Sequence, residues 1–248
     1  MELKGKTPVV EQGSLRGKTI ILTGAARIGQ NIAEELKKQG VNLVITYFKS
    51  KEEAGPFGFP VQADVSKKED VYRVVKTAKN KFGRIDGLIH MAAIYEKTEW
   101  NKLDENYWEK NINVIAKSSF LFGKIAADEM LKNKGKIKGK MIFFSDWSVL
   151  TRPYKDHLPY NTAKAAIVGL AKSFAKELAP YILVNAIAPG PILKPLDLTD
   201  KENKEVLSGT LLGRWGGAEE ITKGVCYLLN ADFVTGTVLT IDGGRTIA

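Results

Sequence analysis

Two side chains that could transfer a proton lie one helical turn apart, at Tyr160 and Lys164 in the segment PYNTAKAAIVGLAKSFAKELA (159–179). Residues four apart on a helix share one face. A phenol, whose ordinary pKa is about 10, is a poor acid–base group at neutral pH unless a nearby cation favours its phenolate. Lys164 could be that cation. The same spacing also begins at Tyr47 and Tyr72, so the surrounding sequence must decide which pair does chemistry.

The sequence around Tyr160 differs from that around the other two tyrosines. An apolar segment over 140–145 reads as a strand and ends next to Asp146, and a short loop then leads to Tyr160 at the start of a helix. Tyr47 instead ends an expected strand, and Tyr72 lies on a polar helix. Tyr160 and Lys164 are therefore the pair that we expect to act in proton transfer.

Short apolar segments rich in β-branched residues alternate with longer helical patterns along the chain. The expected strands are 19–23, 42–47, 59–64, 86–92, 140–145, 182–188 and 238–242, and the expected helices are 29–39, 66–81, 104–132, 159–179 and 218–229. Near-continuous hydrophobic strands between helices are typical of a parallel sheet covered on both faces. We expect a doubly wound α/β fold, a single Rossmann-type domain of seven strands over 15–248, preceded by an N-terminal extension at 1–14.

The first expected strand leads into a glycine-containing turn, TGAARIGQNIAEEL, with Gly24 and Gly29 on either side of it. Such a turn lets the backbone approach a pyrophosphate, whose charge is met by free N–H groups at the helix start. An NAD-preferring site usually offers Asp or Glu after the second strand, where this chain has Lys49 and Ser50. Together with Arg27, they could hold a 2′-phosphate, so we predict NADP(H). A solvated loop lysine remains the alternative for Lys49.

The composition is that of an ordinary globular protein with an excess of basic over acidic residues. The chain has 248 residues, a net charge of +9 and a single cysteine, Cys226, so it has no internal disulfide and we predict no metal site. No apolar run is long enough to span a bilayer, and the N-terminus does not read as a secretory signal, so we expect a cytoplasmic protein with no membrane partner. The lysines are spread along helices without a nucleic-acid motif, and no nucleic-acid partner is expected.

An ordered series of motifs resembles the short-chain dehydrogenase/reductase family over 15–248. The motifs are TGAARIG, QADVS, HMAA, SDWS, YNTAK, NAIAPGPI, GRWGGAEEI and FVTGTVLTIDGG. They are most similar to the branch of pteridine reductases and 3-oxoacyl carrier-protein reductases. The resemblance implies that Tyr160 protonates a carbonyl oxygen while hydride reaches the carbon, and that Lys164 also binds the nicotinamide ribose. Asp146 matches the third catalytic position, with Ser148 as its competitor.

The same resemblance implies a set of cofactor-binding residues. Asp64 and Val65 match an adenine-contacting pair, and the proline-glycine segment 189–192 matches one that lies under the nicotinamide. The full predicted set is Gly24, Arg27, Ile28, Gly29, Lys49, Ser50, Asp64, Val65, Ala92, Ala93, Tyr160, Lys164, Pro189, Gly190 and Ile192. Three aromatic residues, Trp147, Tyr154 and Trp215, either stack on a flat substrate such as a pterin or serve as packing residues.

Several positions depart from the family pattern. The glycine turn is one residue short, and His90-Met91 replaces the usual Asn-Asn. Counting back from Phe120 puts Ile115 where a relay asparagine is common, with Asn113 two residues away. The connection over 49–59 is also too short for an ordinary crossover helix. We expect an NADPH-dependent reductase of a carbonyl or imine substrate, either pterin-like or a 3-oxoacyl group on an acidic carrier protein. The family resemblance implies a homotetramer. The alternative is a catalytically impaired dinucleotide-binding protein with a regulatory or structural role.

Overall fold

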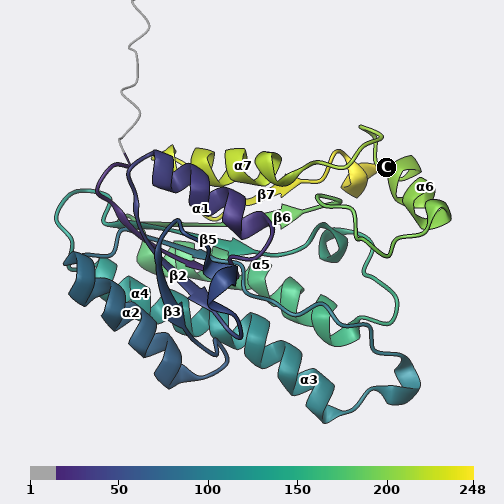
Figure 1. Ribbon diagram of the computed structural model, residues 1–248, viewed down its shortest axis with the longest axis horizontal. Coiled ribbons are helices and arrows are strands. Elements are labelled where there is room, and N and C mark those ends of the chain that lie inside the picture. Colours follow the sequence, from purple (N-terminus) through teal and green to yellow (C-terminus); the bar gives the residue numbers. More distant parts are fainter. Residues whose placement is uncertain (1–14) are drawn as a thin grey trace, which may run out of the picture.

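A computed structural model describes residues 15–248, so the predicted N-terminal extension at 1–14 lies outside the described residues. Seven parallel strands form one sheet in the order β3-β2-β1-β4-β5-β6-β7 (Figure 1). Their bounds are β1 Thr19–Thr23, β2 Asn42–Tyr47, β3 Phe59–Gln62, β4 Gly87–His90, β5 Gly139–Phe144, β6 Ile182–Pro189 and β7 Val238–Ile241. The predicted doubly wound α/β fold is confirmed.

Helices cover both faces of this sheet. They are α1 Ile28–Lys38, α2 Lys68–Phe82, α3 Glu105–Asn111, α4 Ser118–Met130, α5 Leu158–Leu178, α6 Asp200–Ser208 and α7 Ala218–Asn230. Helices α1 and α7 pack together on one face, and α2, α4 and α5 lie on the other (Figure 1). None of the helices among residues 15–248 has the length and apolar character that crossing a membrane requires.

The alternation of side chains along the central strands builds two separate cores. In β1, Ile21 belongs to the apolar cluster under α2, α4 and α5, whereas Ile20 and Leu22 belong to the cluster under α1 and α7. Successive residues of a strand point to opposite faces, so a strand buried on both faces is apolar along most of its length. All five residues of β1 are buried, as are all four of β4.

Two segments differ from the elements that the sequence predicts. The expected helix over 104–132 consists of α3, a π-helical segment Ile112–Lys117 and α4. Helix α6 was not predicted; it begins with a capping box in which Thr199 and Glu202 satisfy each other's backbone N–H groups. The short connection after β2 holds only a 3₁₀ turn, Lys51–Ala54, as the chain length there requires.

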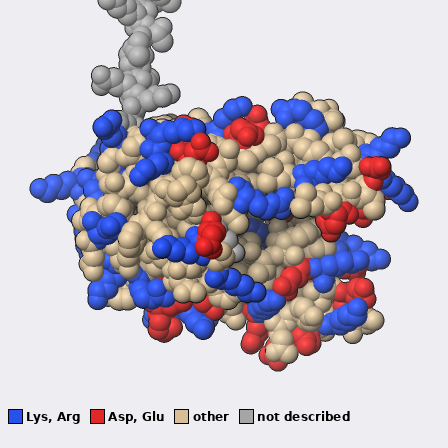
Figure 2. Space-filling view, in the orientation of Figure 1, with Lys and Arg blue, Asp and Glu red and all other residues tan. Residues whose placement is uncertain are grey.

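The basic charge is dispersed. Figure 2 shows Lys and Arg spread over the visible face with acidic residues between them, and a hollow near its centre. Several of the ion pairs on the surface join residues three or four apart on one helix, such as Lys124 with Asp128. This distribution agrees with the expectation that the lysines form solvated helix faces.

Candidate active site

The structure brings the three predicted catalytic side chains together at the carboxyl end of β5. Asp146 follows β5 by two residues, and Tyr160 lies in the first turn of α5. The Tyr160 hydroxyl donates a 2.6 Å hydrogen bond to Oδ2 of Asp146. Lys164, one turn further along α5, donates from Nζ to the carbonyl oxygen of Phe144 at 2.8 Å. Its Nζ lies 5.8 Å from the centre of the Tyr160 ring.

The geometry also separates the two candidates for the third position. Ser148 is fully buried, and its Oγ has no hydrogen-bond partner among the described residues. Its backbone N–H donates to Oδ1 of Asp146 at 2.9 Å, which orients the carboxylate so that the other oxygen faces Tyr160. Asp146, rather than Ser148, therefore contacts the phenol.

The electrostatics of Tyr160 differ from the expectation. Burial, followed by the negative charge of Asp146, raises the pKa of Tyr160 well above its ordinary value. Burial lowers the pKa of Lys164 to about 8. The expected lowering of the Tyr160 pKa by Lys164 is wrong for this arrangement, because desolvation and the adjacent carboxylate outweigh the ammonium group. Tyr160 is consequently protonated at neutral pH, the form that a general acid needs.

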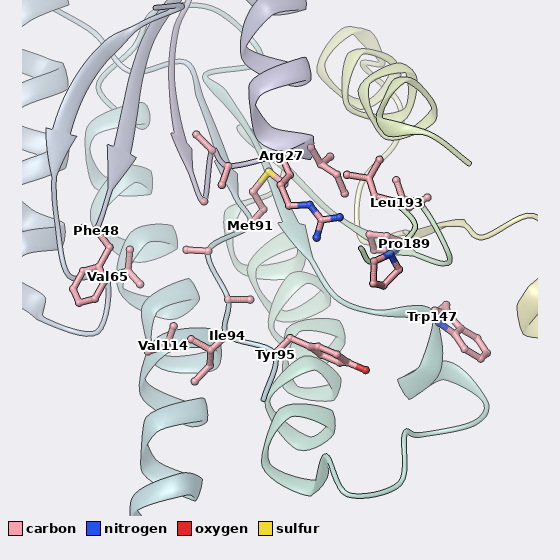
Figure 3. Close-up of a pocket in the computed structure, with 18 of the residues that line it drawn as sticks. Arg27, Phe48, Val65, Met91, Ile94, Tyr95, Val114, Trp147, Pro189 and Leu193 are labelled. Carbon is pink, nitrogen blue, oxygen red and sulfur yellow. The ribbon is translucent and has the colours of Figure 1, made fainter. Parts of the chain in front are cut away.

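A large cavity opens at the carboxyl edge of the sheet. Its volume of about 960 Å³ lies at the upper end of the range, roughly 300–1,000 Å³, that is typical of cofactor and small-molecule sites. Most of the predicted cofactor-binding residues lie on its wall, as Figure 3 shows for Arg27, Val65 and Pro189. The wall includes Gly24, Arg27, Ile28, Asp64, Val65, Ala92, Ala93, Pro189, Gly190 and Ile192.

The shortened glycine turn keeps a close backbone contact. Gly24 has a φ of +71°, and a Cβ there would lie 2.7 Å from the backbone nitrogen of Ala92. Only glycine fits, because the turn packs directly against the segment after β4.

Arg27, immediately before α1, has a φ of 55°. A left-handed non-glycine residue costs on the order of 1 kcal/mol or more, and such residues cluster at ligand sites. Gly29 lies behind this turn, within α1.

Lys49 and Ser50 are not on the cavity wall. The end of β2 instead contributes Tyr47 and Phe48, and the hydroxyl of Ser50 donates to the carboxylate of Glu52. Of the three residues predicted to hold a 2′-phosphate, only Arg27 therefore lines the cavity. Lys49 and Ser50 lie away from the cavity because the loop after β2 turns there into the short 3₁₀ segment.

Aromatic side chains form the opposite end of the cavity, near the catalytic group. Trp147, Tyr154 and Trp215 all line it, and Trp147 Nε1 donates to the Tyr154 hydroxyl at 2.7 Å. Tyr95, from the loop after β4, extends toward the Trp147 side of the cavity (Figure 3). Its ring lies edge-on to that of Tyr160, with the centroids 5.0 Å apart. Tyr160 is only 6% exposed, and the three side chains predicted to be catalytic lie behind the cavity wall.

Sequence reasoning missed two residues of this end, Tyr95 and Arg245, both of which line the cavity. Each follows the carboxyl end of a strand, β4 or β7, by a few residues. In a parallel sheet, these ends meet at the edge where ligands bind. That position was the signal that could have identified them.

The chain is similar to known proteins over most of its length. The family model described as enoyl-(acyl carrier protein) reductase matches residues 24–246. The NAD-dependent glycerol dehydrogenase of Listeria innocua is 33% identical over 94% of this chain and 96% of its own length. The chain belongs to the short-chain dehydrogenase/reductase family. It is thus an oxidoreductase of a family that uses a nicotinamide dinucleotide.

Other relatives in this family differ in what their names say they act on. A 3-oxoacyl-(acyl-carrier-protein) reductase of Staphylococcus aureus is 31% identical over 92% of this chain and 97% of its own length. A short-chain dehydrogenase/reductase of Serratia marcescens has a TM-score of 0.85 and 28% identity, covering 94% of this chain and 99% of that one. The expected branch of the family is not singled out, because glycerol and acyl-carrier relatives match at similar identity.

One departure from the family motif has a defined structural role. His90 ends β4, and its ring nitrogens lie 2.8 Å from Oγ1 of Thr23 on β1 and 2.8 Å from Oγ of Ser118 on α4. Burial, followed by the charge of Lys164, lowers the pKa of His90 to about 3. A neutral imidazole therefore joins two strands and a helix. Ile115, which the sequence places at the position of a relay asparagine, is buried in the core.

Proposed function

We propose that this protein is an NADP(H)-dependent reductase of carbonyl or imine substrates, with Tyr160 as the general acid. The observation that carries the proposal is the hydrogen bond from Tyr160 to Asp146 beside the cavity, within one helical turn of Lys164. A protonated phenol next to a cavity of cofactor size is the arrangement that a hydride-accepting carbonyl requires.

The residues present fit a nicotinamide dinucleotide. Gly24 lines the cavity at the turn before α1, and the Arg27 cation lies at the start of that helix, where a pyrophosphate binds best. Pro189 and Gly190 line the cavity beyond this turn. When bound, the dinucleotide supplies the hydride.

The protein's own contribution is the proton. Tyr160 holds it on the phenol oxygen, in the hydrogen bond to Asp146, and transfers it to a substrate oxygen or nitrogen as negative charge develops there. Lys164, whose pKa is about 8, is charged at neutral pH and stabilises the phenolate that remains. Asp146 keeps the phenol oriented through the 2.6 Å hydrogen bond until the substrate replaces it.

Residues of the cavity wall support the choice of NADP(H), and the aromatic rings and the net charge support the proposed substrate classes. Arg27 lines the cavity, and the residues that the end of β2 contributes to the wall carry no carboxylate. Trp147, Tyr154 and Trp215 suit a flat pterin-like substrate. The net charge of +9 and the name of the Staphylococcus aureus relative suit a 3-oxoacyl group on an acidic carrier protein.

NADPH oxidation, followed with diketones, 3-oxoacyl thioesters and dihydropterins, tests this proposal. Tyr160→Phe should reduce turnover by about 100-fold or more. Tyr154→Phe is the matched control, because it removes another cavity-lining phenol that contacts Trp147 rather than Asp146. Wild-type rates in the Tyr160→Phe variant would contradict the assignment. NADPH binding without turnover of the whole panel would instead support the catalytically impaired alternative.

A homotetramer remains part of the proposal. Phe120 on α4 is 49% exposed and stacks on Phe174 of α5, with ring centroids 6.3 Å apart. An exposed aromatic ring stacked on a half-buried one of the neighbouring helix suits a subunit contact. Phe120→Glu should lower the mass measured by light scattering, whereas an unchanged mass would exclude this surface.

A further inference from the structure

Arg245 occupies an unusual position at the aromatic end of the cavity. It begins the 3₁₀ segment Arg245–Ile247 after β7, and its side chain lines the cavity. The guanidinium carbon lies 4.8 Å from the centre of the Trp147 ring. Nη1 donates to the carbonyl oxygen of Val206 at 2.6 Å and to Oγ1 of Thr210 at 3.3 Å. One nitrogen is thus used to hold the C-terminal end of α6.

The other edge of this guanidinium is free. Among residues 15–248, no recorded hydrogen bond or ion pair uses Nε or Nη2 of Arg245. These two N–H groups lie side by side on the planar group, at the spacing that matches the two oxygens of a carboxylate.

The neighbouring charges do not neutralise Arg245. Arg152 adds a second cation, 5.8 Å from the same Trp147 ring. The carboxylate of Asp242 accepts from the backbone N–H groups of Gly244 and Thr246 and from the Thr246 hydroxyl. Its charge acts on Arg245 against the burial of the guanidinium and the repulsion of Arg152, but it makes no ion pair with Arg245 among residues 15–248, which favours an anionic ligand at this place.

We infer that Arg245 binds a carboxylate of the substrate, so that the protein acts on oxoacids or similar carboxylated carbonyl compounds. This inference rests on the proposed function for the reacting carbonyl. A series of ring contacts connects Arg245 to the acid: Trp147 to Tyr154 at 6.0 Å, Tyr154 to Tyr95 at 5.8 Å and Tyr95 to Tyr160 at 5.0 Å.

The two ends of this site differ in charge. At the catalytic end the Asp146 carboxylate and the Lys164 ammonium offset each other, whereas Arg245 attracts an anion to the other end. A substrate with one carboxylate is therefore oriented with its carbonyl toward Tyr160. The aromatic rings between the two ends contact its apolar part.

Calorimetric titration of the full chain with benzoate and with benzamide tests the inference without requiring turnover. The two probes have the same ring and similar shape and differ in charge. The wild type should bind benzoate about tenfold or more tightly than benzamide. Arg245→Met should abolish that preference. Lys124→Met is the control, since it removes a surface cation on α4 that does not line the cavity, and it should keep the preference.

The neutral probe distinguishes recognition from a loss of structure. If Arg245 serves only to hold α6 in place through its hydrogen bond to Val206, Arg245→Met should weaken the binding of benzoate and of benzamide equally. That result would overturn the inference. Equal binding of the two probes by the wild type, or no measurable benzoate binding, would also overturn it. A benzoate preference that persists while Tyr160→Phe keeps full activity would leave the carboxylate site standing and refute the proposed catalytic role.

Discussion

The Tyr160 hydroxyl, in the first turn of α5, donates a 2.6 Å hydrogen bond to the carboxylate of Asp146, which lies just after β5. A hydrogen bond to an ionised acceptor is short and strong, and here the donor is the group expected to give up its proton. Asp146 thus keeps the phenol protonated and disfavours phenolate. The arrangement suits reduction, in which the phenol must start as an acid.

Replacing this carboxylate should change how Tyr160 titrates. Asp146→Asn removes a negative neighbour that raises the pKa of Tyr160, so that pKa should fall. The alkaline limb of the pH–rate profile for NADPH oxidation should move to lower pH. Asp104→Asn, at the N-terminus of α3, is a control that removes a carboxylate elsewhere. An alkaline limb that stays in place in Asp146→Asn would show that this carboxylate does not control the acid.

Burial of Lys164 should make the protein more stable as the pH rises. The folded-state pKa is about 8, against an ordinary value of 10.5, so above pH 8 the unfolded chain binds more protons than the folded one. The free energy of unfolding should therefore rise between pH 8 and 10, by up to about 3 kcal/mol from this group. Urea unfolding of the wild type and of Lys164→Met measures it. Parallel pH dependence in both proteins would contradict the assigned shift.

His90 should make the protein sensitive to acid. Its folded-state pKa of about 3 lies below the ordinary 6.5, so the unfolded chain binds the extra proton first as the pH falls. This contribution to stability is complete above pH 6.5 and is lost progressively toward pH 3. His90→Asn keeps a polar side chain without a titrating group. The difference in unfolding free energy between variant and wild type should narrow or reverse on acidification, and a constant difference would refute the prediction.

Cofactor choice should depend on Arg27. If its guanidinium contacts the 2′-phosphate, Arg27→Ala should raise the KM for NADPH about tenfold or more while changing that for NADH little. Lys49→Ala is the matched control, because Lys49 lies off the cavity wall. Steady-state kinetics with both cofactors measures the effect. An equal rise in KM for NADPH and NADH would assign Arg27 to the pyrophosphate, and the preference for NADP would then be without support.

The elements of this fold were predictable because each is encoded locally. The strand at 19–23 is apolar and bounded by a glycine turn, and the structure forms β1 over the same residues. Helix α6 was missed because it buries no residue and thus has no apolar stripe to reveal it. The π-helical segment at 112–117 was missed because its pattern reads as ordinary helix.

By itself, the sequence determined the doubly wound sheet, the glycine turn at Gly24 and the pairing of Tyr160 with Lys164, since periodicity and spacing along one element are properties of the local chain. Only the tertiary structure decided that Asp146 rather than Ser148 meets the phenol, that Lys49 and Ser50 lie off the cavity, and that Tyr95 and Arg245 complete it. These relationships join segments far apart in the chain, and burial, which sets the pKa values of Tyr160 and Lys164, exists only once those segments have packed.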